Sequence, residues 1–379
     1  MEQNHLKYKE RINLGSYYTK PDLVSLIYRL IRQNVLNFKD YTLIDTSCGY
    51  GSFFQETDLP FKKIGADIDE TAIKKAGNSN LDISFFCQNS LLNVSRKQYK
   101  LSSEDKIIIV GNPPYNDTTS IIRKSLKQDI KNIDPELKTR DLGISFLLSY
   151  NKLEADYVCI LHPLSYLIKK ANFGLLRPFA EKYILIDAIV ISSDEFSETS
   201  KTTSFPIVIA LYQRNSKGMD YHFIENYSFQ TREGKSFKLS TLDSISRYLS
   251  KYPNQKYVSP RDVVAKFWTM RDINALKRSR TFIQETTTNT VFVTSQKLDY
   301  YCYVDVFKRY ICHVPYYFGN CDVMINNEEF FKIKDFFRYL SLSQHPQIRF
   351  SIAQRENIDH CVDAIDSYFQ NLLGEHYVY

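Results

Sequence analysis

The sequence lacks the features that mark secreted, membrane-spanning or metal-binding proteins. None of its seven cysteines forms a C-x-x-C pair, and their odd, scattered placement favours reduced thiols over disulfides. No apolar run approaches the roughly 18 residues that a membrane-spanning helix requires. The N-terminal segment MEQNHLKYKER is polar and charged, unlike a signal peptide. We therefore expect a cytoplasmic protein with no membrane partner and no metal site.

Glycine is also scarce, with 12 in 379 residues, whereas tyrosine and phenylalanine reach 28 and 25. We attribute this bias largely to an AT-rich coding sequence, so the aromatic content alone is no evidence for stacking on nucleic-acid bases. The net charge of +6 permits a polyanionic partner without requiring one. A hydrophobic fraction of 43% is enough for one large core or two domains.

Short apolar segments rich in β-branched residues recur up to residue 215 and predict seven strands. These are Thr42–Asp45, Lys63–Asp67, Ile83–Cys87, Lys106–Val110, Tyr157–Leu161, Tyr183–Ile191 and Pro206–Tyr212. The predicted helices between or before them are Asp22–Arg32, Glu70–Ala76, Ser120–Ile133, Gly143–Leu153 and Asn172–Lys182. This alternation predicts a doubly wound α/β fold with a seven-stranded, mostly parallel sheet. The loop between the last two strands is too short for a confident helix, so we expect those strands to form an antiparallel hairpin.

The most informative motif is GNPPY, Gly111–Tyr115, which follows a buried strand of the predicted sheet. Ligands of open α/β sheets bind at the carboxyl ends of such strands. The Asn112 side-chain oxygen and the Pro113 carbonyl can both accept hydrogen bonds from a planar amino group, which exposes the lone pair of its nitrogen. Pro113 and Pro114 stiffen the loop, so the acceptors are preorganised. Tyr115 offers a flat face for a planar group such as an extruded base.

Polar residues also follow the first two predicted strands. Asp45, at the end of the first strand, could bind the amino group of an amino-acid ligand, and Gly49 and Gly51 allow a sharp turn close to a ligand before an expected helix. The spacing G-x-G alone is weak evidence for a nucleotide site. Asp67, at the end of the second strand, could hydrogen-bond ribose hydroxyls. Its alternative role, capping the helix that begins near Glu70, suits Asp69 better.

The third strand ends in CQNSLL, where Asn89 or Ser90 could contact an adenine ring. Together with GNPPY, four neighbouring strand ends thus offer groups suited to a nucleoside that carries an amino acid and to a planar amine. This arrangement resembles the S-adenosylmethionine-dependent DNA adenine-N6 methyltransferases. The segment LIDTSCGYGSFF matches their D-x-x-C-G-x-G-x-F cofactor motif, with the matching residues Asp45, Cys48, Gly49, Gly51 and Phe53.

The resemblance extends to the segment before the first strand. GSYYTKP, Gly15–Pro21, is similar to the family's N-terminal G-x-x-x-T-P segment within a lid at residues 11–21, although Lys20 intervenes between Thr19 and the proline. Asn89 also departs from the family, which usually has aspartate there. DYVCILHPLSYL, Asp156–Leu167, is similar to the family's fifth strand. The resemblance implies the class I methyltransferase fold and S-adenosylmethionine as cofactor, bound by Tyr17, Tyr18, Thr19, Asp45, Cys48, Gly49, Gly51, Phe53, Asp67, Ile68, Asn89, Ser90 and Asn112.

The resemblance further implies that the target adenine is flipped out of the duplex and stacks on Tyr115. It points to Phe196 for the other face of the base, with Phe205 as the competitor. The methyl group then passes directly from sulfonium to nitrogen, with no covalent enzyme intermediate. The chain contains no Pro-Cys dipeptide of the kind that carries the nucleophile of cytosine-C5 enzymes. Cys48 is better explained as a small side chain within the cofactor loop.

The order of the motifs, with the extension after the sheet, is the gamma arrangement of restriction-modification methyltransferases. We therefore expect a catalytic domain at 1–215 and a DNA target-recognition domain at 216–379. Within 231–280 there are twelve Lys and Arg against four Asp and Glu, a stretch interleaved with aromatic residues that suits phosphate contacts. The expected partner is double-stranded DNA, and a separately encoded restriction endonuclease is possible.

Three other functions are compatible with the motifs. An RNA adenine or guanine amino-methyltransferase and a protein glutamine methyltransferase both face the same planar amine. The glutamine enzymes usually carry their extra domain before the cofactor motif, whereas here about 40 residues precede it. The third alternative is an inactive DNA-binding subunit on a methyltransferase scaffold, against which the intact Asn112–Tyr115 argues.

Overall fold

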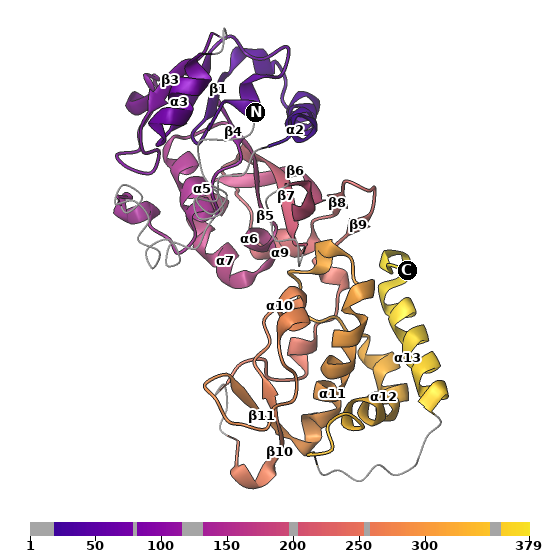
Figure 1. Ribbon diagram of the computed structural model, residues 1–379. Coiled ribbons are helices and arrows are strands. Elements are labelled where there is room, and N and C mark those ends of the chain that lie inside the picture. Colours follow the sequence, from indigo (N-terminus) through magenta and orange to yellow (C-terminus); the bar gives the residue numbers. More distant parts are fainter. Residues whose placement is uncertain (1–18, 79–81, 116–131, 197–203, 254–257, 349–357) are drawn as a thin grey trace. The chain divides into compact units, whose positions relative to one another are not determined.

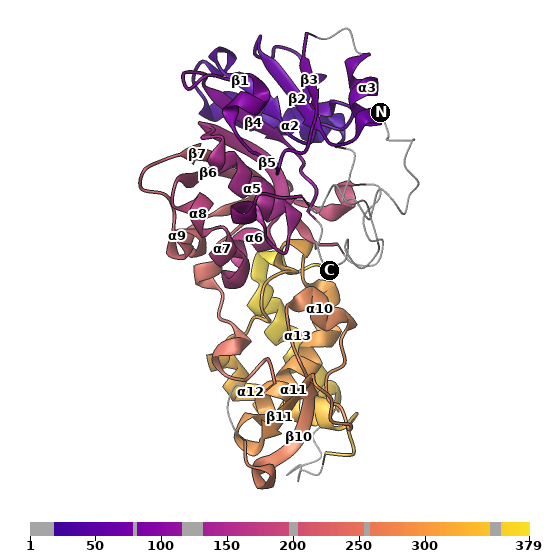
Figure 2. The same ribbon diagram turned by 90° about the vertical axis from the view of Figure 1, so that its left-hand side faces the viewer.

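The computed structural model describes residues 19–78, 82–115, 132–196, 204–253, 258–348 and 358–379. The chain divides into two compact units, Met1–Phe237 and Lys238–Tyr379, and each is described by itself (Figures 1 and 2). Among the described residues, no helix combines the length and the apolar composition needed to cross a membrane.

The first unit is built on one mixed sheet with the order β3-β2-β1-β4-β5-β7-β6-β8-β9. Neighbours from β3 to β5 are parallel, whereas β7 runs antiparallel to both β5 and β6. The expected antiparallel hairpin is therefore confirmed. The seven predicted strands are β1 Thr42–Asp45, β2 Lys63–Asp67, β3 Ser84–Cys87, β4 Ile107–Gly111, β5 Tyr157–Pro163, β6 Tyr183–Ser192 and β7 Pro206–Arg214.

The predicted count of seven strands is wrong, because two short strands extend the sheet beyond β6. Strand β8, Phe229–Thr231, pairs in parallel with β6, and β9, Ser236–Phe237, pairs antiparallel with β8. Strands of three and two residues have too few positions to show an alternating pattern in the sequence. The division between the two compact units falls after Phe237.

Helix α2, Pro21–Asn34, covers one face of the sheet. Its buried residues recur every three or four positions, and Pro21 stands in its first turn, where a missing N–H costs nothing. The buried side chains of α2 share one hydrophobic core with Leu43 of β1, Ile108 of β4 and Leu161 of β5. Because β1 and β4 are buried on both faces, their ends are held rigidly, and the polar residues that follow them form the candidate site.

The remaining helices of this unit follow the prediction in part. Helices α3, Glu70–Gly77, and α5, Leu142–Lys152, lie where they were expected. The predicted helix Asn172–Lys182 is instead split into α7, Lys170–Leu175, and α8, Arg177–Ala180. Pro178 explains the break, because it has no N–H to continue the helical ladder. The other α-helices in the described part of this unit are α6 Ser165–Ile168 and α9 Tyr221–Asn226, while most of the predicted helix Ser120–Ile133 lies outside the described residues.

The second unit combines helices with a two-stranded antiparallel ribbon. The ribbon consists of β10, Val263–Trp268, and β11, Thr290–Thr294. Its described helices are α10 Ile273–Arg278, α11 Leu298–Phe307, α12 Asn327–Leu342 and α13 Ile358–Leu373. Aromatic side chains dominate the core between the helices: the ring of Tyr303 on α11 lies 5.0 Å from that of Phe337 and 5.9 Å from that of Phe369.

Candidate active site

The candidate site forms where β1 and β4 end side by side. The two strands pair in parallel, with Ile44 opposite Ile109, so Asp45 and Gly111 meet at the same edge of the sheet. A Cβ atom on Gly111 would lie 2.9 Å from Asp45 Oδ1, and the φ of Gly111 is +152°. Only glycine allows this close approach of the β4 backbone to the carboxylate.

Asp45 is a buried carboxylate with one oxygen unused. Its Oδ1 accepts the N–H of Ser47 at 3.0 Å, whereas its Oδ2 has no hydrogen-bond partner among the described residues, and neither has the neighbouring Ser47 Oγ. Asp45 is only 1% exposed. Burial, together with the nearby Asp67 carboxylate, raises the pKa of Asp45 to about 8. Such a group favours a ligand that brings a cation and hydrogen-bond donors.

The turn after β1 connects this carboxylate to the end of β2. Gly49 and Gly51 both have a positive φ, +51° and +77°, which allows the sharp turn. The N–H of Gly49 donates to Asp67 Oδ2 at 2.8 Å, and the other carboxylate oxygen accepts the N–H of Asp69 at 2.9 Å. The helix expected after this turn is only a short 3-10 helix, η2, Ser52–Phe54.

Asp67 is fixed by backbone donors on both oxygens, yet burial still raises its pKa. The following residue, Ile68, is 44% exposed, which is unusual for an isoleucine and leaves an apolar surface beside the carboxylate. Asp69 takes the helix-capping role that was preferred for it, because its Oδ1 accepts the N–H groups of Thr71 and Ala72 at the start of α3.

Cys48 and Phe53, the other members of the cofactor motif, are structural in character. Cys48 is buried, and burial raises the pKa of its thiol well above the usual range. A protonated, enclosed thiol is a poor nucleophile, in agreement with its interpretation as a small loop side chain. Phe53 is part of the core beneath the loop, where its carbonyl accepts the hydroxyl of Tyr28 at 2.7 Å.

The two candidates after β3 are both engaged within the protein. The amide of Asn89 donates to the Asn132 carbonyl at 2.7 Å, and its Oδ1 accepts the N–H of Leu91 at 3.0 Å. Ser90 is buried, and its hydroxyl donates to the Thr46 carbonyl at 2.7 Å, which ties this loop to the end of β1. In this conformation these two side chains shape the loop.

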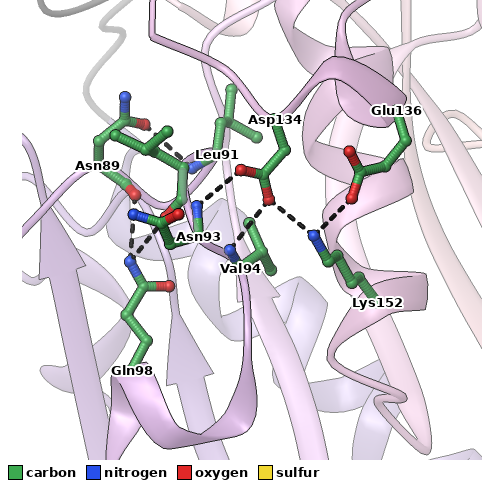
Figure 3. A network of polar contacts seen from close by, with 9 residues as sticks. Asn89, Leu91, Asn93, Val94, Gln98, Asp134, Glu136 and Lys152 are labelled. Carbon is green, nitrogen blue, oxygen red and sulfur yellow. Dashed lines mark hydrogen bonds and ion pairs between the residues drawn. The ribbon is translucent and has the colours of Figure 1, made fainter.

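A buried carboxylate, Asp134, also holds the loop after β3 (Figure 3). Asp134 accepts the N–H groups of Asn93 at 2.8 Å and Val94 at 3.1 Å, and Lys152 of α5 donates to it at 2.7 Å. Although burial opposes ionisation of Asp134, the Lys152 ammonium and the two N–H groups outweigh it and lower the pKa of the carboxyl. The loop after β3 is therefore anchored to α5 by charge-assisted bonds.

In the GNPPY motif, Asn112 is held by one end of its amide only. Its Nδ2 donates to Thr19 Oγ1 at 3.2 Å, so the expected lid segment reaches the motif through its described residue. Its Oδ1 is buried and has no hydrogen-bond partner in the part of the chain that the structure describes. Leaving a buried acceptor unsatisfied costs about 1–3 kcal/mol, and such groups cluster at functional sites.

Tyr115 is half-buried and lies against the start of α5. A Cβ atom on Gly143 would be 3.0 Å from Tyr115 Cβ and 2.5 Å from the Tyr166 hydroxyl, so glycine at 143 makes room for both tyrosines. The Tyr166 hydroxyl donates to Asp141 Oδ1, which also accepts the N–H of Gly143 at 3.0 Å. These neighbours fix the place of Tyr115.

The two phenylalanines proposed for the second face of a base differ in exposure. Phe196 is 2% exposed and packs in the core shared with α2, whereas Phe205 is only partly buried beside it. In this conformation Phe205 therefore offers more ring surface than Phe196.

The structure thus brings together Thr19, Asp45 and Asn112. Asp67 is connected to this group because it accepts the N–H of Gly49, in the turn that follows Asp45. Tyr17 and Tyr18 lie outside the described residues. Sequence reasoning missed the roles of Gly111 and Gly143, although a glycine is a visible signal in a chain with so few.

The residues present fit S-adenosylmethionine. Asp45 Oδ2 and Ser47 Oγ are buried polar atoms with no described partner, as expected for groups that await an ammonium. Asp67 and the exposed Ile68 provide an acid and an apolar surface next to one another, as a nucleoside requires. Among the described residues there is no group of three or more His, Cys, Asp or Glu that could hold a metal ion.

Comparisons with known proteins found partial similarity to methyltransferases. No family model matches the chain. It is 26% identical over 157 residues to the type I restriction enzyme MjaIX methylase subunit of Methanocaldococcus jannaschii, a match that covers 39% of this chain and 26% of that protein. Among solved structures, it is similar to a type I restriction-modification methyltransferase subunit from Streptococcus thermophilus, with a TM-score of 0.38, 15% identity and coverage of 65% and 51% of the two chains. Another is the N-methyltransferase NodS of Bradyrhizobium japonicum in complex with S-adenosyl-L-homocysteine, with a TM-score of 0.31, 11% identity and coverage of 51% and 86%.

Proposed function

We propose that this chain is a site-specific DNA methyltransferase that transfers a methyl group from S-adenosylmethionine to the N6 amino group of a flipped-out adenine. The observation that supports this most is the buried Oδ1 of Asn112, which has no hydrogen-bond partner among the described residues. Asn112 follows β4, and the neighbouring strand β1 ends in Asp45, whose Oδ2 also has no described partner. One acceptor suits an amine to be methylated, and the other suits the ammonium of the methyl donor.

Asn112 and Pro113 would activate the adenine amine. Both amine protons donate, one to Asn112 Oδ1 and one to the Pro113 carbonyl, which draws the nitrogen towards tetrahedral geometry and frees its lone pair. Thr19 holds the other end of the Asn112 amide, so the acceptor needs no rearrangement during the reaction. Pro113 and Pro114 restrict the loop in the same way.

S-adenosylmethionine supplies an electrophilic methyl group on a sulfonium. Asp45 would bind its amino group, Asp67 its ribose hydroxyls, and Ile68 would pack on its adenine. The Gly49 N–H keeps Asp67 in place from the same turn that follows Asp45, so both carboxylates move as one unit.

A base within a duplex hides its amino group, so the adenine must leave the stack, at a cost of a few kcal/mol. Tyr115, supported by Gly143 and Tyr166, would stack on one face of the extruded base. For the other face of the base, Phe205 is the candidate in this conformation, because Phe196 is only 2% exposed. Phe196 could take this role only after a rearrangement that exposes its ring.

The remaining assignments follow from the same proposal. The motif order is the gamma arrangement, the second unit recognises the DNA target, and a separately encoded endonuclease is a candidate partner. The similarity to the type I methylase subunit of M. jannaschii supports a restriction-modification role, although the match spans only 26% of that protein.

A labelled-methyl assay tests the proposal. The purified protein is incubated with radiolabelled S-adenosylmethionine and with duplex DNA, RNA or total protein, and cofactor binding is measured separately by calorimetry. We expect label in DNA only, and sequencing of host DNA by a modification-sensitive method should locate N6-methyladenine at one short motif. Label in RNA or in protein would show that DNA is not the substrate. Failure to bind the cofactor would contradict the proposal that the chain is a methyltransferase.

A further inference from the structure

The β10–β11 ribbon of the second unit has one face that is buried and one that is only partly buried. Ala265, Phe267, Val291 and Val293 are buried, and the ring of Phe267 lies 5.0 Å from that of Tyr301 on α11. Figure 1 shows both strands beside α11. Because side chains alternate along a strand, the positions between these residues point away from this core.

Two large aromatic side chains and a lysine occupy that outer face. Lys266 pairs directly with Phe292 across the strands, and Trp268 pairs with Thr290. Phe292 is 37% exposed, and Trp268 and Lys266 are half-buried. The guanidinium of Arg280 lies 5.6 Å from the centre of the Trp268 ring, so a second cation belongs to the same face.

The charges around the ribbon are unbalanced. None of the six basic side chains within 258–294 forms an ion pair with a carboxylate in the described part of the chain, whereas Arg247 and Lys251 just before them do. The six are Arg261, Lys266, Arg271, Lys277, Arg278 and Arg280. Only three acids, Asp262, Asp272 and Glu285, occur in the same range. Lys266 instead donates to the Gln284 carbonyl at 2.9 Å. A concentration of cations without carboxylate partners, around the exposed Phe292 and the half-buried Trp268, is complementary to a polyanion that also presents flat groups.

We propose that the outer face of the β10–β11 ribbon, formed by Lys266, Trp268, Arg280 and Phe292, binds duplex DNA. The inference rests on the proposed function and names the contact surface within the second unit. A two-stranded ribbon fits the width of the major groove. Lys266 and Arg280 would contact phosphates, and Trp268 and Phe292 would contact the apolar edges of bases or sugars.

Trp268 is the single tryptophan of the chain, so its fluorescence reports on this face in the unmodified protein. The full-length protein is titrated with a fluorescein-labelled 30-base-pair duplex to follow binding by anisotropy, and with the unlabelled duplex to follow quenching of Trp268 by acrylamide. We expect saturating DNA to lower the quenching constant by about half or more. Unchanged quenching at a DNA concentration that saturates anisotropy would overturn the inference.

A salt titration measures the phosphate contacts. The double variant Lys266→Gln/Arg280→Gln should reduce the slope of log affinity against log salt by about 1.8, as expected for two lost phosphate contacts. The matched control is Lys332→Gln/Lys334→Gln on α12, where Lys334 lies 5.5 Å from the ring of Phe331 and the loss of charge is the same. An equal change in both double variants would contradict a specific role for the ribbon.

The two proposals fail in different ways. If the protein binds DNA but neither measurement involves the ribbon, the surface is wrong and the methyltransferase proposal stands. If duplex RNA of the same sequence protects Trp268 from quenching and duplex DNA does not, DNA is the wrong partner in both the ribbon proposal and the methyltransferase proposal. If neither duplex binds, the inference fails, and the calorimetric test of cofactor binding still decides the enzyme.

Discussion

The two units differ in whether their buried polar atoms all have hydrogen-bond partners. In the described residues, every buried side-chain nitrogen or oxygen that lacks a hydrogen-bond partner lies in the first unit, among them Asp45 Oδ2, Ser47 Oγ and Asn112 Oδ1. In the second unit, the buried tyrosines are satisfied: Tyr303 donates to the Met324 carbonyl at 2.6 Å, and Tyr301 donates to the Ser250 carbonyl at 2.7 Å.

Under the proposed function, this difference is the one expected between a unit that binds ligands within its interior and a unit whose interior only supports a surface. Unsatisfied buried groups destabilise a fold, so they persist where a ligand compensates for them. The second unit has none among its described residues, and its unpaired charges instead lie on the outside, around the ribbon. Substitutions of the unsatisfied groups of Asp45 and Asn112 should therefore impair catalysis or cofactor binding, whereas substitutions of buried polar groups in the second unit should affect only stability.

The largest effect should follow removal of the Asn112 acceptor. We expect Asn112→Ala to lower the rate of methyl transfer by at least about 10²–10³-fold, the usual loss for one preorganised hydrogen-bonding group, with DNA affinity nearly unchanged and cofactor affinity lowered far less than the rate. Single-turnover transfer of labelled methyl and calorimetry measure the two quantities.

Asn112→Asp separates the acceptor from its support, because it keeps an oxygen but loses the N–H that donates to Thr19. Its rate should fall between those of the wild type and Asn112→Ala. Asn226→Ala, on the exposed helix α9, is the matched control. Turnover of Asn112→Ala near the wild-type rate would show that the unsatisfied Asn112 oxygen has no catalytic role. The proposed difference between the two units would then lose its main support.

A smaller effect is expected from Gly111→Ala. The added methyl group would lie 2.9 Å from Asp45 Oδ1, and a φ of +152° is unfavourable for alanine by about 1–3 kcal/mol. Displacement of Asp45 should weaken cofactor binding about tenfold or more and should also lower the melting temperature. Gly77→Ala, where nothing lies within 4 Å of the new methyl group, should leave affinity unchanged. Equal affinities of the two variants would show that Asp45 does not contact the cofactor.

Much of the sheet could be predicted from the sequence because its strands are short, apolar and buried. β1 and β2 have the predicted ends, β4 is shifted by one residue at both ends, and each of the other four predicted strands differs by one or two residues at one end. The break at Leu176 was missed, although Pro178 is visible in the sequence, because apolar periodicity continues across it. Strand β8 is held by pairing with β6, about 40 residues earlier, which no local pattern reveals, and β9 in turn pairs with β8.

The candidate site was predictable to the extent that its residues follow strand ends. The parallel order places Asp45 next to the GNPPY motif, but the contact between Gly111 and Asp45 depends on backbone geometry. The engagement of Asn89 by Asn132 joins segments that are far apart in the sequence. The buried position of Phe196 likewise depends on packing against α2, which its local sequence does not indicate.

The pH dependence of cofactor binding gives a test of intermediate size. With a pKa of about 8, Asp45 is mostly protonated at pH 7 in the free protein, and an ammonium favours its ionised form. Binding should release up to one proton, so affinity should rise by up to about tenfold per pH unit between roughly pH 6.5 and 7.5. Calorimetry in buffers of different ionisation enthalpy measures the proton. Asp45→Asn should bind weakly and without proton release.

Asp45 should also make the free energy of unfolding depend on pH. Because the pKa of Asp45 is raised from 3.8 to about 8, the folded protein retains a proton that the unfolded chain loses, so the contribution of Asp45 to the free energy of unfolding falls as pH rises through this window. Asp45→Asn should reduce that fall. A wild-type protein that binds the cofactor with no proton release at pH 7 would contradict the buried, protonated state.

The smallest effect is expected in the second unit, where a buried hydroxyl is structural. Tyr303→Phe removes the hydrogen bond to the Met324 carbonyl but keeps the ring within its aromatic cluster, so the free energy of unfolding should fall by about 1 kcal/mol. Cofactor affinity, measured by calorimetry, should equal that of the wild type, because the interior of this unit has no assigned ligand. Thermal unfolding with and without cofactor separates the two quantities. A loss of cofactor affinity comparable to that of Gly111→Ala would mean that the core of the second unit supports the cofactor site, and the division of roles between the units would be wrong.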